Sequence, residues 1–436
     1  MYHKPTGEIV TRDDPEGRMR NGIASDADFV TFEAVVSTEE GQLAIAPGYL
    51  EREWTEGGRR HFAYRMDAPI LDFYAFQSGR YAVRRDRWND VAIEVWHHPG
   101  HEYNLDRMIA ATKDGLDYFT AAFGPYQHRQ FRIVEFPRYR TFAQSFPNTI
   151  PYSEGIGFIA RVRDDDPEDV DYPYYVTAHE LAHQWWAHQV IGADVQGETM
   201  LVESLAQYSA LMVMKKKYGE ARMQRFLRYE LERYLIGRST EQKKELPLAR
   251  VENQDYVHYR KGSLVMYALQ DYLGEATLNR AIRAFRDEWA FKGPPYPTTL
   301  DFLKHVRAVT PPPLQGTIDD LFESIVLWDN RAASATAKRL PDGRYEVAVD
   351  VVAKKRRADE LGRESDAPVD DWIDVGVLDD EGAPLALAKR RIDREASTHA
   401  FVVDRRPARA GIDPFNKLID RKPKDNTVAV TIEPSG

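Results

Sequence analysis

Apolar and polar residues alternate with a period of two over the first part of the chain. Between Phe29 and about Val83, segments such as DFVTFEAVVST and RRHFAYRMD follow this pattern and are separated by turn-forming clusters. Such alternation is typical of strands that bury one face. The sequence therefore predicts an antiparallel N-terminal β-domain, which is only partial, over residues 26–87. Residues 1–25 are polar, and their composition predicts a disordered segment or linker.

The periodicity changes after residue 88. A strand near residues 90–100, a helix over 104–124 and an apolar strand over 131–137 follow one another, which is a mixed α/β pattern. Further helices are predicted over residues 174–190, 201–219, 220–238, 256–275, 276–291, 298–310 and 317–329. These elements define a predicted α/β domain over residues 88–332.

Strand patterns return from about Ala335. The predicted strands of this last region cover residues 344–356, 371–379, 383–393 and 427–434. They predict a β-sandwich-like domain over residues 333–436. The fold class that follows is multidomain α+β, in the order β-domain, α/β domain, β-domain.

Composition narrows the possible functions. The net charge of −10 argues against binding to a nucleic-acid backbone. The absence of cysteine excludes disulfides, thiol catalysis and a cysteine-type zinc site. We expect no transmembrane helix, because the chain lacks an apolar run of roughly 18 residues, and its N-terminus lacks the apolar region of a signal peptide. We therefore expect a cytosolic protein or a soluble piece of a longer one.

The segment HELAH contains the most informative residues of the chain. His179 and His183 are four residues apart, so on a helix they lie on one face and can hold the same ion. Glu180 lies one step round the helix, where it can act as a general base without being a ligand. Together these residues form an H-E-x-x-H zinc signature.

A third ligand is predicted at Glu203. Nineteen residues, Gln184 to Val202, separate it from His183, and Glu203 opens the next apolar helix, which ends at Gly219. Two helices joined by a turn return Glu203 to the face that carries the histidines. Two histidines, one glutamate and an open fourth position are typical of catalytic zinc, so we predict one zinc ion per chain. His188 lies off this face, on the surface or next to a ligand.

These residues, with Tyr259 inside HYRKG, resemble the gluzincin aminopeptidases of the aminopeptidase N type. The resemblance implies a β-domain, a thermolysin-like catalytic domain and a small β-sandwich. It also implies that the two histidines and the later glutamate bind zinc, that Glu180 is the general base, and that Tyr259 stabilises the oxyanion. Tyr256 is the alternative tyrosine.

The chain departs from this family at the G-x-M-E-N exopeptidase loop. PYSEGIGF takes its place, with Glu154 at the position of the glutamate that binds the substrate amine. The segments SFPNTIPYSEGIGFI and AGIDPFNKLIDRKPKDN resemble peptidase-like domains fused to the permeases of bacterial ABC transporters. That resemblance implies a domain tethered to a membrane protein, on the extracytoplasmic side in preference to the cytoplasmic one.

We therefore expect a zinc metallopeptidase that acts on peptides, most plausibly from a free N-terminus, with no nucleic-acid partner. Two alternatives stay open. The chain could be a peptide-binding or regulatory module of a transporter with weak or no turnover, or it could be a zinc endopeptidase.

Overall fold

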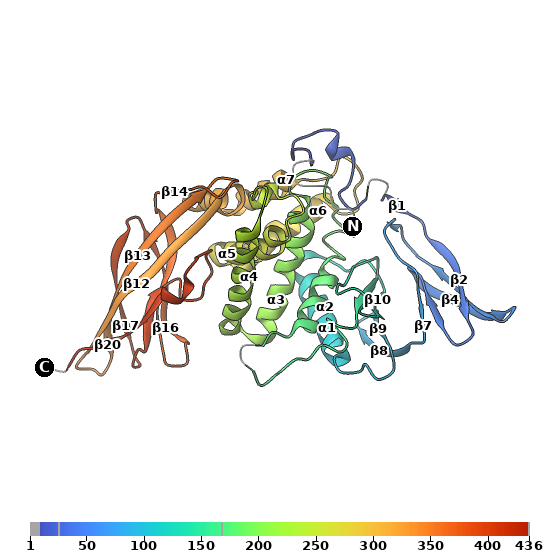
Figure 1. Ribbon diagram of the computed structural model, residues 1–436, viewed down its shortest axis with the longest axis horizontal. Helices are drawn as coiled ribbons and strands as arrows, with labels where there is room; N and C mark the ends of the chain where they lie inside the picture. The colour runs from blue at the N-terminus through green and yellow to red at the C-terminus, as the bar shows by residue number, and fades with distance from the viewer. Residues whose placement is uncertain (1–8, 25–26, 167–168, 435–436) are drawn as a thin grey trace. The chain divides into compact units, whose positions relative to one another are not determined.

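The computed structural model describes residues 9–24, 27–166 and 169–434, which form two compact units (Figure 1). The first unit contains the chain up to residue 217 together with residues 249–253 and 273–310. The second contains residues 218–248 and 254–272 and the chain from 311 onward. The predicted domain 88–332 is therefore shared between both units. Each unit is built from segments that are distant in sequence. Domain boundaries predicted from local composition cannot show which distant segments pack together.

The N-terminal part of the first unit is antiparallel β-structure, as the alternating pattern predicts. Its strands are β1 (Phe29–Val30), β2 (Glu33–Glu39), β3 (Leu43–Ile45), β4 (Tyr49–Glu56), β5 (Arg59–Arg65), β6 (Ile70–Leu71) and β7 (Gln77–Gly79). They pair in the orders β2-β5-β4, β1-β6 and β3-β7. Phe32, Phe62, Tyr64 and Ile70 form the small core that these strands bury.

A mixed sheet follows in the same unit. Its strands are β8 (Ala82–Trp88), β9 (Val91–His97), β10 (Gln130–Phe136) and β11 (Thr149–Ser153). The order is β11-β10-β9-β8, in which β10 runs parallel to both neighbours and β8 is antiparallel to β9. The predicted boundary at residues 87/88 therefore falls inside β8, which pairs with β9 and belongs to this sheet. The seven residues of β10 are all buried, including the polar Gln130, Arg132 and Glu135.

Helices complete the first unit, and the first of them contacts β8 and β9. They are α1 (Leu105–Phe123), α2 (Tyr172–Ala182), α3 (Leu205–Tyr218), α6 (Glu275–Trp289) and α7 (Thr299–Val309). Helices α1 and α2 lie side by side (Figure 1). They approach closely at Gly115, where a Cβ would lie 2.7 Å from Leu181 Cδ2 and would displace the end of that side chain.

Residues 9–24 are ordered, so the predicted disorder of residues 1–25 is wrong for this part; residues 1–8 and 25 lie outside the described residues. The segment contains a short 3-10 turn, η1 (Gly17–Met19). Its backbone pairs with the connection between α2 and α3: Asp194 N donates to Arg20 O at 2.8 Å and Gln196 N donates to Val10 O at 2.8 Å. Amino-acid composition cannot predict the long-range hydrogen bonds that order this segment.

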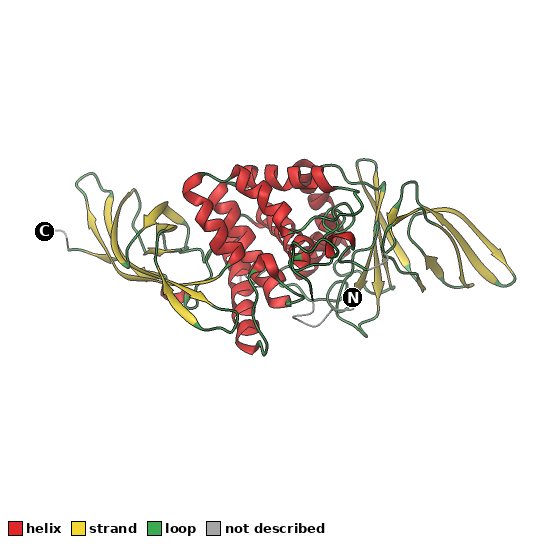
Figure 2. Cartoon of the chain, turned by 90° about the horizontal axis from the view of Figure 1, so that it is seen from above, coloured by secondary structure: helices red, strands yellow, loops and turns green. Residues whose placement is uncertain are grey.

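The second unit combines helices with two sheets (Figure 2). The helical segments are α4 (Glu220–Thr240), η4 (Tyr256–Lys261), α5 (Gly262–Leu273), η5 (Pro312–Leu314), α8 (Gln315–Ile318) and η6 (Asp319–Glu323), while η3 (Leu248–Arg250) spans the boundary between units. One sheet contains β12 (Ile325–Arg339), β13 (Tyr345–Ala358), β14 (Glu364–Ala367), β17 (Ala396–Val403) and β20 (Thr431–Ile432). The other contains β15 (Asp371–Leu378), β16 (Pro384–Ile392), β18 (Arg409–Ile412) and β19 (Thr427–Ala429), and η7 (Pro423–Asp425) precedes β19.

The predicted C-terminal β-structure is present, but it begins earlier than residue 333. Residues 325–329, which we expected to end a helix, open β12 instead, because the apolar run Ile325–Trp328 is buried on both faces of the strand. The short or polar strands β14, β17 and β18 were not predicted. Across the described ranges, no helix is both long and apolar enough to cross a bilayer.

The turn at Gly197, which precedes the second metal-ligand helix, gives a test of this packing. Its φ is +88°, and a Cβ there would lie 2.4 Å from Ala249 O and 2.6 Å from Thr299 Cγ2. Gly197→Ala should lower the free energy of unfolding by at least about 3 kcal/mol, because left-handed backbone strain and overpacking add. Urea denaturation followed by circular dichroism measures this loss.

Gly274→Ala is the matched control. Gly274 has a similar φ of +82°, but a Cβ there would have no neighbour within 4 Å. It should cost only the strain of about 1–2 kcal/mol. Equal losses in the two variants would contradict the close approach at Gly197.

Candidate metal centre

Helix α2 positions the first two predicted ligands. Asp171 caps its N-terminus by accepting a hydrogen bond from Tyr174 N at 3.1 Å, and Pro173 lies in the first turn. The α-helix ends at Ala182, so the expected helix over 174–190 is shorter than predicted. His183 N still donates to His179 O at 3.3 Å, which keeps both imidazoles on one face of the last turn.

Glu203 reaches the same place from a π-helical turn. This turn, η2 (Met200–Ser204), runs directly into α3. Single π-helical turns are rare and are often found at functional sites, because the wider turn redirects one side chain. The sequence correctly predicts that Glu203 opens a helix, but it does not predict this widened turn.

The three ligand atoms converge. His179 Nε2 lies 3.1 Å from His183 Nε2, and Glu203 Oε2 lies 3.3 Å from the first and 3.4 Å from the second. A tetrahedral ion with bonds of about 2.0–2.1 Å keeps its ligand atoms about 3.3 Å apart. The spacing of the three atoms therefore fits a single zinc-sized ion bound to all of them.

The donor set also fits a cation electrostatically. The three residues are between 6 and 8% exposed, and Glu203 Oε2 is a fully buried oxygen that faces the two imidazole nitrogens. Burial opposes ionisation of Glu203, but the charges of His183 and His179 and their hydrogen bonds hold its pKa well below the usual range. Burial likewise opposes protonation of His183, yet the charge of Glu203 raises the pKa of His183 to about 9. Positive charge is thus strongly favoured at this point.

His183 is oriented by its second ring nitrogen. His183 Nδ1 lies 3.0 Å from Trp186 O, which favours the tautomer with the proton on Nδ1. Such a hydrogen bond fixes the ring and leaves Nε2 free to bind a metal. This carbonyl belongs to the turn that follows α2, so the early end of the helix allows the carbonyl to orient His183.

Glu180 lies beside the ligands and is buried. Burial raises its pKa above the usual range, and Glu203 adds to this, while His183, His179 and the backbone N–H of Ser145 oppose it. A carboxylate whose proton affinity is raised is better suited to take a proton from water near neutral pH. Its position next to the ligand cluster agrees with the predicted role of general base.

Ser145 links Glu180 to Gln184 and His188, and the sequence analysis did not predict this link. His188 Nε2 lies 3.1 Å from Ser145 O, and Gln184 Nε2 donates to Ser145 Oγ at 2.7 Å. His188 is buried, and burial lowers its pKa to about 4. The surface position considered for His188 is therefore wrong. No sequence pattern links residue 145 to residues 184 and 188, so only the folded chain reveals this contact.

Glu154 follows β11 and lies in a second polar cluster. Its Oε1 accepts a hydrogen bond from Arg138 N at 3.2 Å, and its Oε2 lies 3.9 Å from His101 Nδ1. The same imidazole nitrogen is 2.5 Å from Glu135 Oε1 on β10. Glu154 is thus grouped with His101 and Glu135, apart from the three predicted metal ligands.

Tyr259 belongs to the second unit, in the π-helical turn η4. Its side chain is half-buried, and its ring contacts that of His258 with centroids 4.5 Å apart. Tyr256, the alternative tyrosine, donates its hydroxyl to Glu241 Oε2 at 3.1 Å. That hydrogen bond gives Tyr256 a structural role and leaves Tyr259 as the preferred candidate.

The chain is similar to peptidases of known sequence and structure. Residues 108–323 match the model of the peptidase family M1 domain. Endoplasmic reticulum aminopeptidase 2 of Homo sapiens is 22% identical over 209 residues, which cover 46% of this chain and 22% of that protein. The crystal structure of Legionella pneumophila aminopeptidase A in complex with aspartic acid has a similar fold, with a TM-score of 0.60 and 16% identity.

The structural match covers 94% of this chain and 45% of the Legionella chain, so the chain spans less than half the length of both relatives. Residues 108–323, just under half of the chain, are thus similar to the peptidase family M1 domain. The predicted ligands and Glu180 lie inside this range, as does Tyr259. The resemblance seen in the sequence is thereby confirmed at the level of the family domain.

The cluster predicts about one tightly held zinc ion per chain. His183→Ala and Glu203→Ala each remove one of three ligands and should reduce bound zinc to less than about a tenth of one equivalent. Elemental analysis after exhaustive dialysis measures the zinc content. His188→Gln is the control, because it keeps a hydrogen-bond donor near Ser145 and is not a ligand. Equal zinc loss in this control would contradict the assignment.

Proposed function

We propose that this chain is a zinc-dependent aminopeptidase that releases residues from the N-termini of peptides. The observation that carries the proposal is the buried convergence of His179, His183 and Glu203 at distances suited to one tetrahedral ion, with the Glu180 carboxylate beside them. The peptidase M1 domain match over residues 108–323 supports the same class of hydrolase.

The ligand residues and Glu180 would divide the work of hydrolysis. Zinc held by His179, His183 and Glu203 would supply an activated water and polarise the scissile carbonyl. Glu180 takes a proton from the attacking water and returns it to the leaving amine. Its raised pKa, which burial causes, favours both steps near neutral pH. Water attack breaks the peptide bond and leaves a free carboxylate and a free amine.

Tyr259 is proposed as the donor that stabilises the developing oxyanion. The support is its place in the sequence HYRKG and the structural use of the neighbouring Tyr256 hydroxyl by Glu241. A well-placed donor of this kind is typically worth about 3–4 kcal/mol in the transition state.

Glu154 is proposed to bind the ammonium group of the substrate. It offers a carboxylate that is mostly buried and lies near Glu135, so the local charge is suited to a cation. The hydrogen bond from Arg138 N fixes Oε1 and leaves Oε2 facing His101. A buried ammonium without an acidic partner is costly, so this carboxylate would favour free N-termini over blocked ones.

Glu180→Gln tests the mechanism. The substitution preserves shape and removes the basic carboxylate, so turnover should fall by at least about 100-fold while bound zinc stays unchanged. Steady-state kinetics on aminoacyl p-nitroanilides, with elemental analysis of the same sample, measure both quantities. Loss of zinc in this variant would make Glu180 a ligand. A native chain that binds zinc and peptide without turnover would be a binding module.

Glu154→Ala tests the specificity. We expect KM for peptides with a free N-terminus to rise by at least about 10-fold, since a buried charge loses its partner, while N-acetylated peptides are unaffected. Matched pairs of free and acetylated fluorogenic peptides measure the difference. Arg138→Ala is the comparison variant, because it keeps the backbone N–H that donates to Glu154 and removes only the exposed guanidinium, whose Nε lies 3.9 Å from Glu154 Oε1. Equal turnover of free and blocked peptides by the native chain would favour an endopeptidase.

A further inference from the structure

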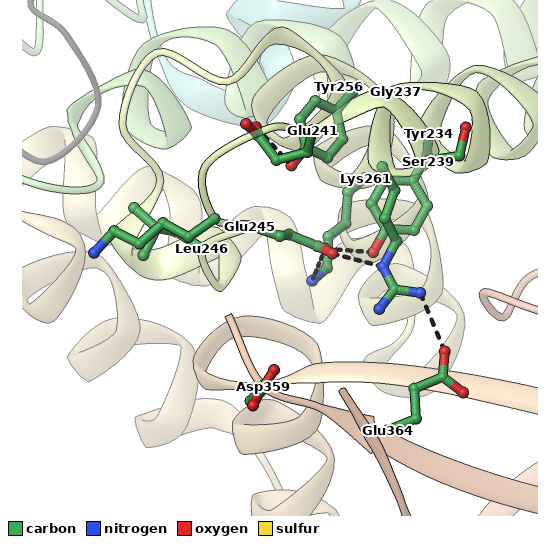
Figure 3. Close-up of polar contacts among 12 residues, drawn as sticks. Tyr234, Gly237, Ser239, Glu241, Glu245, Leu246, Tyr256, Lys261, Asp359 and Glu364 are labelled. Atoms are coloured by element: carbon green, nitrogen blue, oxygen red, sulfur yellow. Dashed lines mark hydrogen bonds and ion pairs between the residues drawn. The ribbon is translucent and has the colours of Figure 1, made fainter. Parts of the chain in front are cut away.

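The π-helical turn that carries Tyr259 is enclosed by one short segment of the second unit. Residues 241–246 follow α4 and contact both ends of η4. At one end, Glu241 Oε2 accepts the hydroxyl of Tyr256 at 3.1 Å. At the other end, Glu245 Oε1 lies 3.8 Å from Lys261 Nζ. Figure 3 shows both contacts on the two sides of the turn.

Lys261 is an unusual residue in this position. It is 1% exposed, and within the described residues its ammonium makes no hydrogen bond. Its acidic neighbour is Glu245, and the ring of Tyr234 lies 5.8 Å from Nζ. Removing one partner of a buried ion pair leaves an uncompensated charge, so the two residues are strongly coupled. The position of Lys261, and with it the end of the turn, depends on Glu245.

Glu245 is itself held rigidly. It accepts hydrogen bonds from Tyr234 Oη at 2.6 Å and from Arg238 Nε at 2.6 Å, both from α4. Arg238 Nη1 also lies 3.5 Å from Glu364 Oε1 on β14. Figure 3 shows Glu245 as the point where the contacts from Tyr234 and Lys261 meet. The turn is thus connected through buried charges to both α4 and the C-terminal sheet.

A close backbone approach fixes the turn from its other side. Gly237 of α4 lies against Tyr256, and a Cβ added to Gly237 would be 2.3 Å from Tyr256 Cβ. Any larger residue at this position must push α4 and η4 apart. The turn is therefore constrained by a steric contact near its start and by an ion pair at its end, with Tyr259 between them.

We propose that Lys261, Glu245 and Gly237 are positioning residues for Tyr259. They hold the π-helical turn in one conformation and so fix the position of the Tyr259 side chain. This inference rests on the proposed function, because it assigns these residues to the aminopeptidase reaction. It adds that the ion pair acts on catalysis through Tyr259 and not through the zinc ligands, which lie on other elements.

A double-variant cycle with Tyr259→Phe tests the proposal in the full chain, with an aminoacyl p-nitroanilide as the probe. Lys261→Met should lower kcat by about 10- to 100-fold, because a displacement of about 1 Å in a catalytic group has an effect of this size. KM and zinc content should stay nearly unchanged. In the Tyr259→Phe background, the same substitution should lower kcat no further than about twofold, since the hydroxyl to be positioned is already absent.

Gly237→Ala is the second variant, for the case in which Lys261→Met does not fold. It adds one methyl group, changes no charge, and should show the same dependence on Tyr259. Ser239→Ala is the matched control on α4, because the Ser239 hydroxyl is exposed and donates to Ile236 O. It should leave kcat unchanged.

Three results would overturn the proposal. Lys261→Met or Gly237→Ala could lower kcat by the same factor with and without the Tyr259 hydroxyl, which is the behaviour of a general structural role. Either variant could lower the melting temperature and leave kcat intact. Tyr259→Phe alone could have no effect on kcat, which would remove the group to be positioned. The last result leaves the roles of zinc and Glu180 untouched, because Glu180→Gln tests these separately.

Discussion

The buried carboxylate of Glu203 facing two imidazoles is the interaction on which the site depends. Removing a carboxylate from water is costly unless it is paired with groups of opposite charge. This desolvation occurs where Glu203 Oε2 and the Nε2 atoms of His179 and His183 lie within 3.4 Å of one another. A divalent cation bound to all three atoms would compensate for the three desolvated groups at once, which a proton on one histidine cannot do.

The surroundings of this cluster are organised to keep it fixed. The end of α2 at Ala182 frees the carbonyl of Trp186 to orient His183. Gln184 and His188 hold the loop at Ser145 against the same turn, and the backbone N–H of Ser145 contacts Glu180. Glu180 is therefore contacted by a loop residue that two residues of the turn after α2 hold in place. A shift of the turn after α2 would move His183 and Glu180 together.

The second unit is also held together by buried charges, in a chain with no cysteine. Asp271 of α5 binds Lys389 and Lys417, and the same two lysines contact Asp374 of β15. This alternation of two acids and two bases joins the helix to the C-terminal sheets. Ion pairs of this kind add little net stability, but they penalise wrong packing because each misplaced charge would be buried alone. The buried ion pair of Lys261 and Glu245 near Tyr259 would penalise wrong packing in the same way.

The sequence alone determined the donor set, the helices that carry it and the β-structure at both ends of the chain. These features are local: a spacing of four residues places two histidines on one helical face, and alternation marks a strand. The tertiary structure decided the rest. It paired β8 with β9, ordered residues 9–24 against the connection that leads to Glu203, and placed Glu154 next to His101. These contacts join residues far apart in sequence, and their formation depends on packing and long-range hydrogen bonds that no local pattern encodes.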